Sequence, residues 1–179
     1  MNYRALIVLA GCVLFGRSAS AEETIKVGDA APQFTLSYAT KDTIVKNGFS
    51  LASHIGRNTI ILAFYPADWS GGCTSEMCTM RDSFSDLSRL GCDVVGISGD
   101  YVYSHREWAK HLGLQFPLLS DHSHEVAKLY NSYNPDTGMN KRTVFVINKQ
   151  GTIAYADFEY STRTLDSFNK LKAALENLH

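Results

Sequence analysis

The sequence predicts an α/β domain of three layers, in which helices cover both faces of a mixed β-sheet. Strand patterns and helix patterns alternate along most of the chain, which is typical of parallel β-α-β units. The last third carries two strand patterns joined by a short turn and then a helix, which indicates antiparallel pairing as well. No internal repeat and no Pro- or Ser-rich linker divides the chain, so we expect one domain over residues 22–179.

The first half of the chain supplies a hairpin, a buried strand and a helix. Residues 32–51 alternate short β-type runs with turn residues, which predicts an N-terminal β-hairpin. Residues 58–65, NTIILAFY, form a continuous apolar run, as expected for a strand buried on both faces. Residues 73–91 place Met77, Met80, Phe84 and Leu87 at helical spacing and end on glycine, which predicts one amphipathic helix.

The second half repeats the alternation and closes with a hairpin and a helix. Strands are expected at 92–98, 116–120, 142–148 and 153–158, with the last two joined by the turn KQG. Helices are expected at 104–113, 124–130 and 165–178.

The charge balance and the N-terminal segment limit the classes of protein to which this chain can belong. The chain has 17 basic and 18 acidic residues, so no basic excess favours nucleic acid as a partner. Residues 1–21 have a basic start, an apolar run of 12 residues and a small-x-small pattern ending at Ala21. This layout is typical of a cleaved signal peptide and predicts export without stable membrane insertion. LAGC at Leu9–Cys12 resembles a lipoprotein signal, but the apolar stretch before Cys12 is short, so cleavage after Ala21 is preferred.

Removal of residues 1–21 would leave three cysteines, Cys73, Cys78 and Cys92. An odd number excludes a fully disulfide-bonded framework and fits a redox centre in an exported protein better. Cys92 begins a strand and is expected to be a buried structural thiol.

Cys73 follows a buried strand, a Pro-containing loop and Gly71-Gly72, and lies at the predicted start of the helix. Unpaired N–H groups and the positive end of the helix dipole stabilise a thiolate there. Ser70 can cap the helix or donate to the thiolate, and the two glycines let backbone N–H groups come close. These features predict a nucleophile.

Cys78 lies five positions further on, so the two Cα atoms would be roughly 8.7 Å apart in a regular helix. Disulfides need a Cα separation below about 7 Å. A bond between Cys73 and Cys78 therefore requires the helix to open.

Four interpretations of this pair remain open on spacing alone. The cysteines could be a buried residue and a solvated thiol without a joint role, or a metal site that includes His122 or His124. A thioredoxin-type exchange site is disfavoured because its spacing is Cys-x2-Cys, whereas this is Cys-x4-Cys. The fourth interpretation is a peroxide-reducing thiol with a resolving partner in the same helix.

Several motifs together resemble the peroxiredoxins of the AhpC/TSA family. PADWSGGC fits their Pro-x-x-x-Thr/Ser-x-x-Cys motif, and TSEMCTMRD resembles the bacterioferritin-comigratory or Q-type subgroup. GDAAPQFTL, VVGISGD, HLGLQFPLLSD and RTVFVINKQG agree with the family in order and spacing, from about Val27 to the C-terminus. The resemblance implies a thioredoxin-like fold with an N-terminal β-hairpin extension.

The resemblance also implies roles for individual residues. Cys73 corresponds to the peroxidatic cysteine and Cys78 to the resolving one, while Pro66 would shield the pocket from water. Ser70 stands where threonine is commoner. Arg142 matches the arginine that steadies the thiolate and the developing oxyanion.

Two further features near the motif are less defined. Glu76 and Arg81 are expected on the helix surface or behind the residues that touch the thiolate. The loop lacks the family's usual proline next to the cysteine, and its Trp69 is expected to pack on the loop rather than line a pocket.

The implied activity is reduction of hydrogen peroxide and organic hydroperoxides, with no metal or organic cofactor. A thioredoxin-like dithiol protein would regenerate the thiols, and the protein would be a monomer or weak dimer. The alternatives are an exported copper-binding protein of thioredoxin-like fold and a general thiol–disulfide oxidoreductase.

Overall fold

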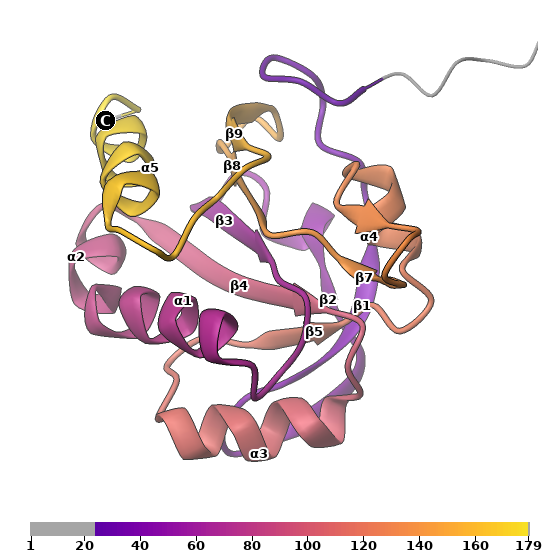
Figure 1. Ribbon diagram of the computed structural model, residues 1–179. Helices are drawn as coiled ribbons and strands as arrows, with labels where there is room; N and C mark the ends of the chain where they lie inside the picture. The colour runs from indigo at the N-terminus through magenta and orange to yellow at the C-terminus, as the bar shows by residue number, and fades with distance from the viewer. Residues whose placement is uncertain (1–23, 179) are drawn as a thin grey trace, which may run out of the picture.

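The computed structural model describes residues 24–178, which form a seven-stranded sheet with helices on both faces (Figure 1). The strand order is β2-β1-β5-β4-β3-β8-β9. The strands are β1 Thr35–Ala39, β2 Ile44–Ser50, β3 Thr59–Phe64, β4 Cys92–Ser98, β5 Leu118–Ser120, β8 Thr143–Ile147 and β9 Ile153–Asp157. β3, β4 and β5 run parallel and the outer pairings are antiparallel, which confirms the predicted mixed sheet.

The helices are α1 Gly71–Asp82, α2 Phe84–Arg89, α3 Val102–Leu112, α4 Glu125–Leu129 and α5 Asp166–Glu176, with a 3-10 turn η1 at Leu51–Ser53. The connections β3-α1-β4 and β4-α3-β5 step in the same direction across the sheet. Because such crossovers are right-handed, α1 and α3 cover the same face. The chain then returns through α4 to β8 on the other side of β3, which places α4 on the opposite face (Figure 1).

Alternation along β3 divides the interior into two cores. Ile61, Ala63 and Tyr65 pack with α1, α2, α3 and α5, whereas Ile60, Leu62 and Phe64 pack with α4 and η1. All residues of β3 are buried, as the apolar run predicts.

The N-terminal hairpin is confirmed and extends the sheet. β1 pairs with β2, with Thr35 opposite Ser50, and its other edge pairs with β5, with Ser37 opposite Ser120. A short two-stranded ribbon of β6 Tyr133–Asn134 and β7 Met139–Asn140 was not predicted, because two residues per strand carry no pattern.

The prediction of a single helix over residues 73–91 is wrong. The chain breaks at Ser83, whose φ of −97° and ψ of 4° leave the helical region. The Ser83 carbonyl then accepts the N–H groups of Asp86 and Leu87, both at 3.0 Å, and so opens α2. Serine favours such boundaries, and Phe84 and Leu87 still pack against the same core.

Gly96 lies where β4 passes beneath Tyr65. A Cβ atom there would lie 2.7 Å from Leu118 Cδ2 and 3.2 Å from Tyr65 Cε1. We expect Gly96→Ala to lower the free energy of unfolding by about 1–3 kcal/mol, because overpacking displaces buried side chains. Urea denaturation measures the change.

The matched control is Gly71→Ala, since nothing lies within 4 Å of a Cβ atom at that position. Alanine also favours the helix over glycine, so this variant should match or exceed the native stability. Equal stability of the two variants would contradict tight packing around Gly96.

Candidate active site

The site forms where β3 ends and α1 begins. The chain leaves the sheet after Tyr65, passes through the loop of residues 66–70 and enters α1 at Gly71. Ser70 is the N-cap residue, with extended backbone angles of φ −77° and ψ 145°. Its carbonyl accepts the Thr74 N–H at 2.9 Å. Its side chain makes no capping hydrogen bond to the described helix, so the hydroxyl remains available to a neighbour or a ligand.

Cys73 lies in the first turn of α1 and is fully buried. The Nη2 atom of Arg142 donates to its Sγ atom at 3.3 Å. The pairing of β8 with β3 causes this contact, because Thr143 lies opposite Phe64 and so places Arg142 beside the start of the loop. The thiol therefore faces both the positive end of a helix and a guanidinium group.

Gly72 makes room for the guanidinium. A Cβ atom on Gly72 would lie 3.1 Å from Arg142 Nη2. The space that a side chain at this position would fill is occupied by the cation of Arg142.

Glu76 lies on the buried side of α1, one turn after Cys73, rather than on the helix surface. Its Oε2 atom accepts a hydrogen bond from Arg142 Nη1, and its Oε1 atom is buried without a partner among the described residues. Burial raises the pKa of Glu76 from its ordinary value of 4.5 to about 7, although Arg142 favours the charged form.

Arg142 is thus shared between a carboxyl group and a thiol. Burial alone lowers the pKa of Arg142, but Glu76 and Cys73 outweigh burial and leave the pKa above its ordinary value. The guanidinium keeps its charge and can stabilise an anion at either partner.

The other two cysteines occupy different environments. Cys78 is half-buried within α1 and packs against the core beside that helix. Both Cys73 and Cys78 are free thiols in one continuous helix, as the spacing argument assumed. Cys92 is buried, and burial raises its pKa to about 11, which fits the expected structural thiol.

Pro66 and Trp69 lie at the two ends of the loop. Pro66 is half-buried and follows Tyr65 directly. Trp69 is 54% exposed, and its Nε1 atom donates to Ser104 Oγ at 3.3 Å, so it lies against α3. Arg81 lies on the outer part of α1, where it pairs with Asp82 and donates to the Leu112 carbonyl.

The structure also adds two residues that the sequence interpretation did not include, Asp68 and His105. Asp68 is buried in the loop and contacts His105 of α3, with 2.9 Å between Oδ2 and Nδ1. The sequence carries a signal for burial of His105, because this residue lies on the apolar face of α3. The other buried residues of that face are Val102, Trp108, Ala109 and Leu112.

His122 and His124 do not join the cysteines. His122 contacts Tyr101 and the Gly99 carbonyl, and His124 contacts Asn140. Within residues 24–178, no group of three or more His, Cys, Asp or Glu side chains is placed to hold a metal ion. The copper-binding alternative therefore receives no support from these residues.

Within the same residues, none of the helices has the length and apolar character needed to cross a membrane. The predicted signal peptide, with Cys12 and Ala21, lies outside the described part of the chain.

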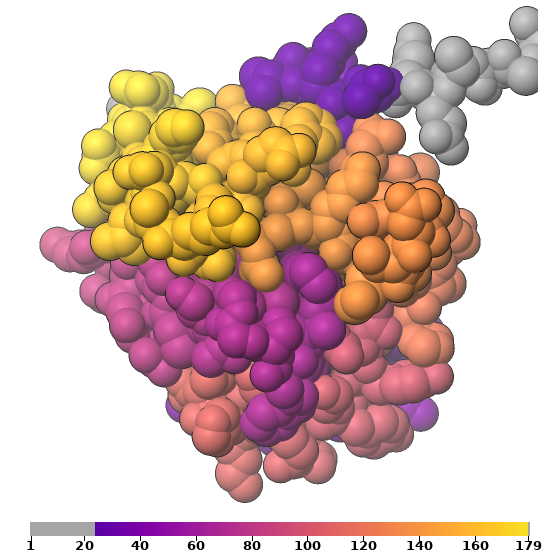
Figure 2. Space-filling model, viewed as in Figure 1, coloured from indigo at the N-terminus to yellow at the C-terminus, as the bar shows by residue number. Residues whose placement is uncertain are grey.

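Segments far apart in the sequence meet at α1. In the space-filling view the magenta atoms of α1 lie against orange and yellow atoms of the C-terminal third (Figure 2). A buried, cation-paired thiol at a strand-to-helix turn of an α/β sheet defines the class as a thiol-based redox protein of thioredoxin-like fold.

Comparison with known proteins identifies the family. The AhpC/TSA family matches residues 27–156, and the chain belongs to this family. It is 36% identical over 132 residues to peroxiredoxin Q of rice, chloroplastic, covering 73% of this chain. It is also 36% identical over 154 residues to a putative peroxiredoxin of Mycobacterium tuberculosis, covering 83% of this chain and 93% of that one. The resemblance to the Q type of peroxiredoxins is thereby confirmed.

Solved structures of peroxiredoxins have a similar fold. The crystal structure of peroxidoxin BcpB from M. tuberculosis superposes with a TM-score of 0.74 at 28% identity, covering 87% of this chain and 99% of that one. AhpC of Enterococcus faecalis gives a TM-score of 0.75 at 24% identity over 84% of this chain and 90% of its own, which supports the fold. The chain spans 58% of the length of the rice relative.

The raised pKa of Glu76 predicts a pH dependence of stability. The folded state binds the proton more tightly than the unfolded state, so Glu76 costs progressively more stability as pH rises from 4.5 through about 7. Each pH unit in that window is worth about 1.4 kcal/mol, so the loss is on the order of 3 kcal/mol. Glu76→Gln should remove this loss, as measured by urea denaturation across the window.

The control is Glu125→Gln, which changes an exposed glutamate of α4. If the native protein and Glu76→Gln follow the same pH profile, burial does not control the Glu76 carboxyl.

Proposed function

We propose that this protein is a thiol-dependent peroxidase that reduces hydrogen peroxide and organic hydroperoxides. The observation that carries the proposal is the 3.3 Å contact of Arg142 Nη2 with Cys73 Sγ at the start of α1. A guanidinium beside the sulfur stabilises the thiolate and the negative charge that develops on the peroxide oxygens. Membership of the AhpC/TSA family and the peroxiredoxin relatives support the same activity.

In the first step the Cys73 thiolate attacks the terminal oxygen of the hydroperoxide. The O–O bond breaks, the sulfur is oxidised to a sulfenic acid, and the other oxygen leaves as water or an alcohol after taking a proton. Arg142, which contacts the sulfur, can donate hydrogen bonds to the reacting oxygens, and the uncommitted hydroxyl of the N-cap Ser70 is a second candidate donor.

In the second step the Cys78 thiol condenses with the sulfenic acid, water leaves, and a Cys73–Cys78 disulfide forms. Because both cysteines lie in α1, its first turns must open for the sulfur atoms to meet. An external dithiol protein of thioredoxin-like type then restores both thiols by exchange.

We also propose that the protein is exported, on the strength of its N-terminal sequence pattern alone. Residues 1–21 carry the signal-peptide layout, and an exported peroxidase would need a reductant outside the cytosol. We further propose that the protein acts as a monomer or weak dimer.

Cysteine variants separate the two chemical steps. Cys73→Ser should abolish peroxide consumption, because the attacking sulfur is lost. Cys78→Ser should consume about one peroxide per subunit and then stop, because the sulfenic acid has no resolving partner. A peroxide-consumption assay with a panel of dithiol proteins gives both results, and Cys92→Ser is the control.

Full turnover by Cys73→Ser would overturn the proposal. Normal turnover by Cys78→Ser would instead assign resolution to another thiol.

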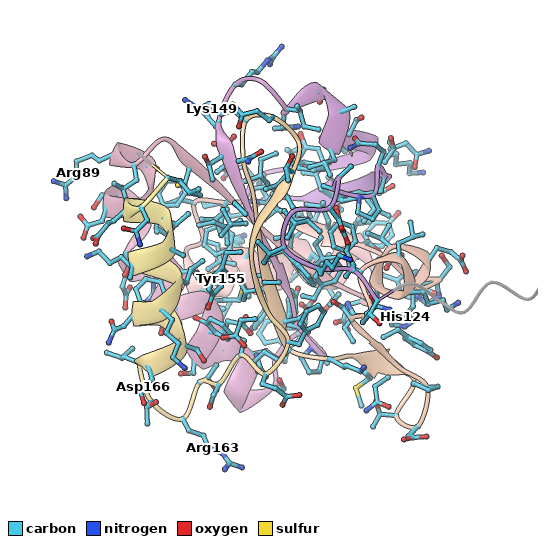
Figure 3. All side chains as sticks on the ribbon, turned by 90° about the horizontal axis from the view of Figure 1, so that it is seen from above. Arg89, His124, Lys149, Tyr155, Arg163 and Asp166 are labelled. Carbon is cyan, nitrogen blue, oxygen red and sulfur yellow. The ribbon has the colours of Figure 1, made fainter. Side chains whose placement is uncertain are left out.

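Arg142 is tested against a neighbouring arginine. Arg142→Gln should slow the reaction of Cys73 with peroxide by about 100-fold or more, since losing a hydrogen-bond donor to the transition state typically costs that much. The control is Arg163→Gln, because Arg163 lines the same surface pocket but extends away from the body of the molecule (Figure 3).

Stopped-flow measurement of peroxide reduction compares the two variants. Equal slowing would mean that the net charge of the region matters rather than the contact with Cys73.

Export is tested by the mass of the protein purified from its producing cells. Cleavage after Ala21 predicts a mature chain that begins at Glu22. A lipid-modified N-terminus at Cys12 would contradict that cleavage, and an intact N-terminus would contradict export.

A further inference from the structure

The loop of residues 66–70 is tied to the rest of the molecule by a buried polar cluster that the reaction steps above do not use. The Asp68 carboxylate accepts hydrogen bonds from the Tyr65 hydroxyl at 2.8 Å and the Ser104 hydroxyl at 2.7 Å. Its Oδ2 atom also lies 2.9 Å from His105 Nδ1, and the side chains of Asp68 and His105 have no exposed area.

Both ring nitrogens of His105 lie near oxygen atoms of other segments. Its Nε2 atom lies 3.2 Å from the Leu119 carbonyl oxygen, which can only accept, so this nitrogen carries a proton. Its Nδ1 atom faces the carboxylate of Asp68, which already accepts two hydroxyl groups. Both ring nitrogens therefore face acceptor oxygens, an arrangement in which an imidazolium would donate on both sides.

The other titratable groups around the pair are Tyr65 at the end of β3 and Asp100 before α3. Burial raises the pKa of Tyr65 well above its ordinary value, so its hydroxyl stays protonated and donates. Asp100 accepts the backbone N–H of Asp68 at 2.9 Å and the Ser98 hydroxyl at 2.7 Å. Both the backbone and the side chain of Asp68 are thus held.

The residue that follows is held in an unfavourable conformation. Trp69 has a φ of +62°, in the left-handed region that bulky residues rarely adopt. Its Nε1 atom donates to the same Ser104 hydroxyl that donates to Asp68. Such a conformation persists only where its surroundings fix it, and here the first turns of α3 do so.

The loop of residues 66–70 determines where α1 begins. Trp69 is followed by the N-cap Ser70 and then by Gly71, Gly72 and Cys73. We propose that Asp68 and His105 are positioning residues for peroxide reduction, whose buried ion pair holds the loop so that Ser70 and Cys73 are placed for attack. This inference rests on the proposed function. Since His105 belongs to α3, opening of the first turns of α1 leaves the pair intact.

The proposal predicts that the two chemical steps respond differently. Asp68→Asn and His105→Gln should each slow the reaction of Cys73 with hydrogen peroxide by about 10- to 100-fold, because misplacement by about 1 Å can cost that much. Formation of the Cys73–Cys78 disulfide should stay within about threefold of the native rate. The double variant should be no slower than the slower single variant, because the two residues act as a unit.

Stopped-flow tryptophan fluorescence with hydrogen peroxide follows both steps, and thermal unfolding gives the stability of each variant. The matched control is Val126→Ala, which leaves a cavity in the core on the opposite face of the sheet. It should lower stability without slowing either step. If His105→Gln does not fold, Ser104→Ala removes one hydroxyl donor at a half-buried position and should slow the first step by about three- to tenfold.

Nitrogen NMR of the His105 ring gives a second readout. Both ring nitrogens should be protonated at neutral pH in the native protein, and one should lose its proton in Asp68→Asn. A neutral His105 ring in the native protein would overturn the ion pair.

If the native protein reacts with hydrogen peroxide, and Asp68→Asn and Ser104→Ala react at the same rate, the positioning role alone is overturned. A native protein that does not react with hydroperoxides would overturn the proposed function, and this inference with it.

Discussion

The contact between the Arg142 guanidinium and the Cys73 sulfur is the interaction on which the rest of the site depends. A buried thiolate without a cation would be costly, and the helix terminus supplies only part of the compensation. The contact in turn depends on the register of β8 against β3, which places Arg142 beside the loop. A slip of one residue would turn alternate side chains to the other face and remove the arginine from the site.

The helix α1 has to satisfy two opposing requirements. It must be intact to present Cys73 to a peroxide beside Arg142, and it must open for Cys73 to reach Cys78. Packing is uneven along the helix, since Gly71 and Gly72 are exposed whereas Met77 and Met80 are fully buried. Opening of the first turns therefore costs less than loss of the whole helix. The loop before α1 is held from α3 and can remain in place.

Much of the fold was predictable because alternation and apolar runs are local signals. The hairpin at residues 32–51 and the buried strand at 58–65 both follow from such patterns. The break at Ser83 was not predictable, because the apolar spacing continues through it and only packing on the sheet decides the direction of α2. The burial of Glu76 and the pairing of Asp68 with His105 also depend on distant segments, Arg142 before β8 and the first turns of α3. The place of Arg142 beside Cys73 came from the family resemblance rather than from the residues themselves.

Hydrogen exchange of the α1 amides before and after one equivalent of peroxide tests whether α1 opens when Cys73 and Cys78 form a bond. Amides in the first turns of α1 should lose protection when the Cys73–Cys78 disulfide forms, and regain it on reduction. Amides of α3 should keep their protection throughout. A Cys73–Cys78 disulfide with unchanged protection of α1, or an oxidised protein without that bond, would contradict resolution by opening of α1.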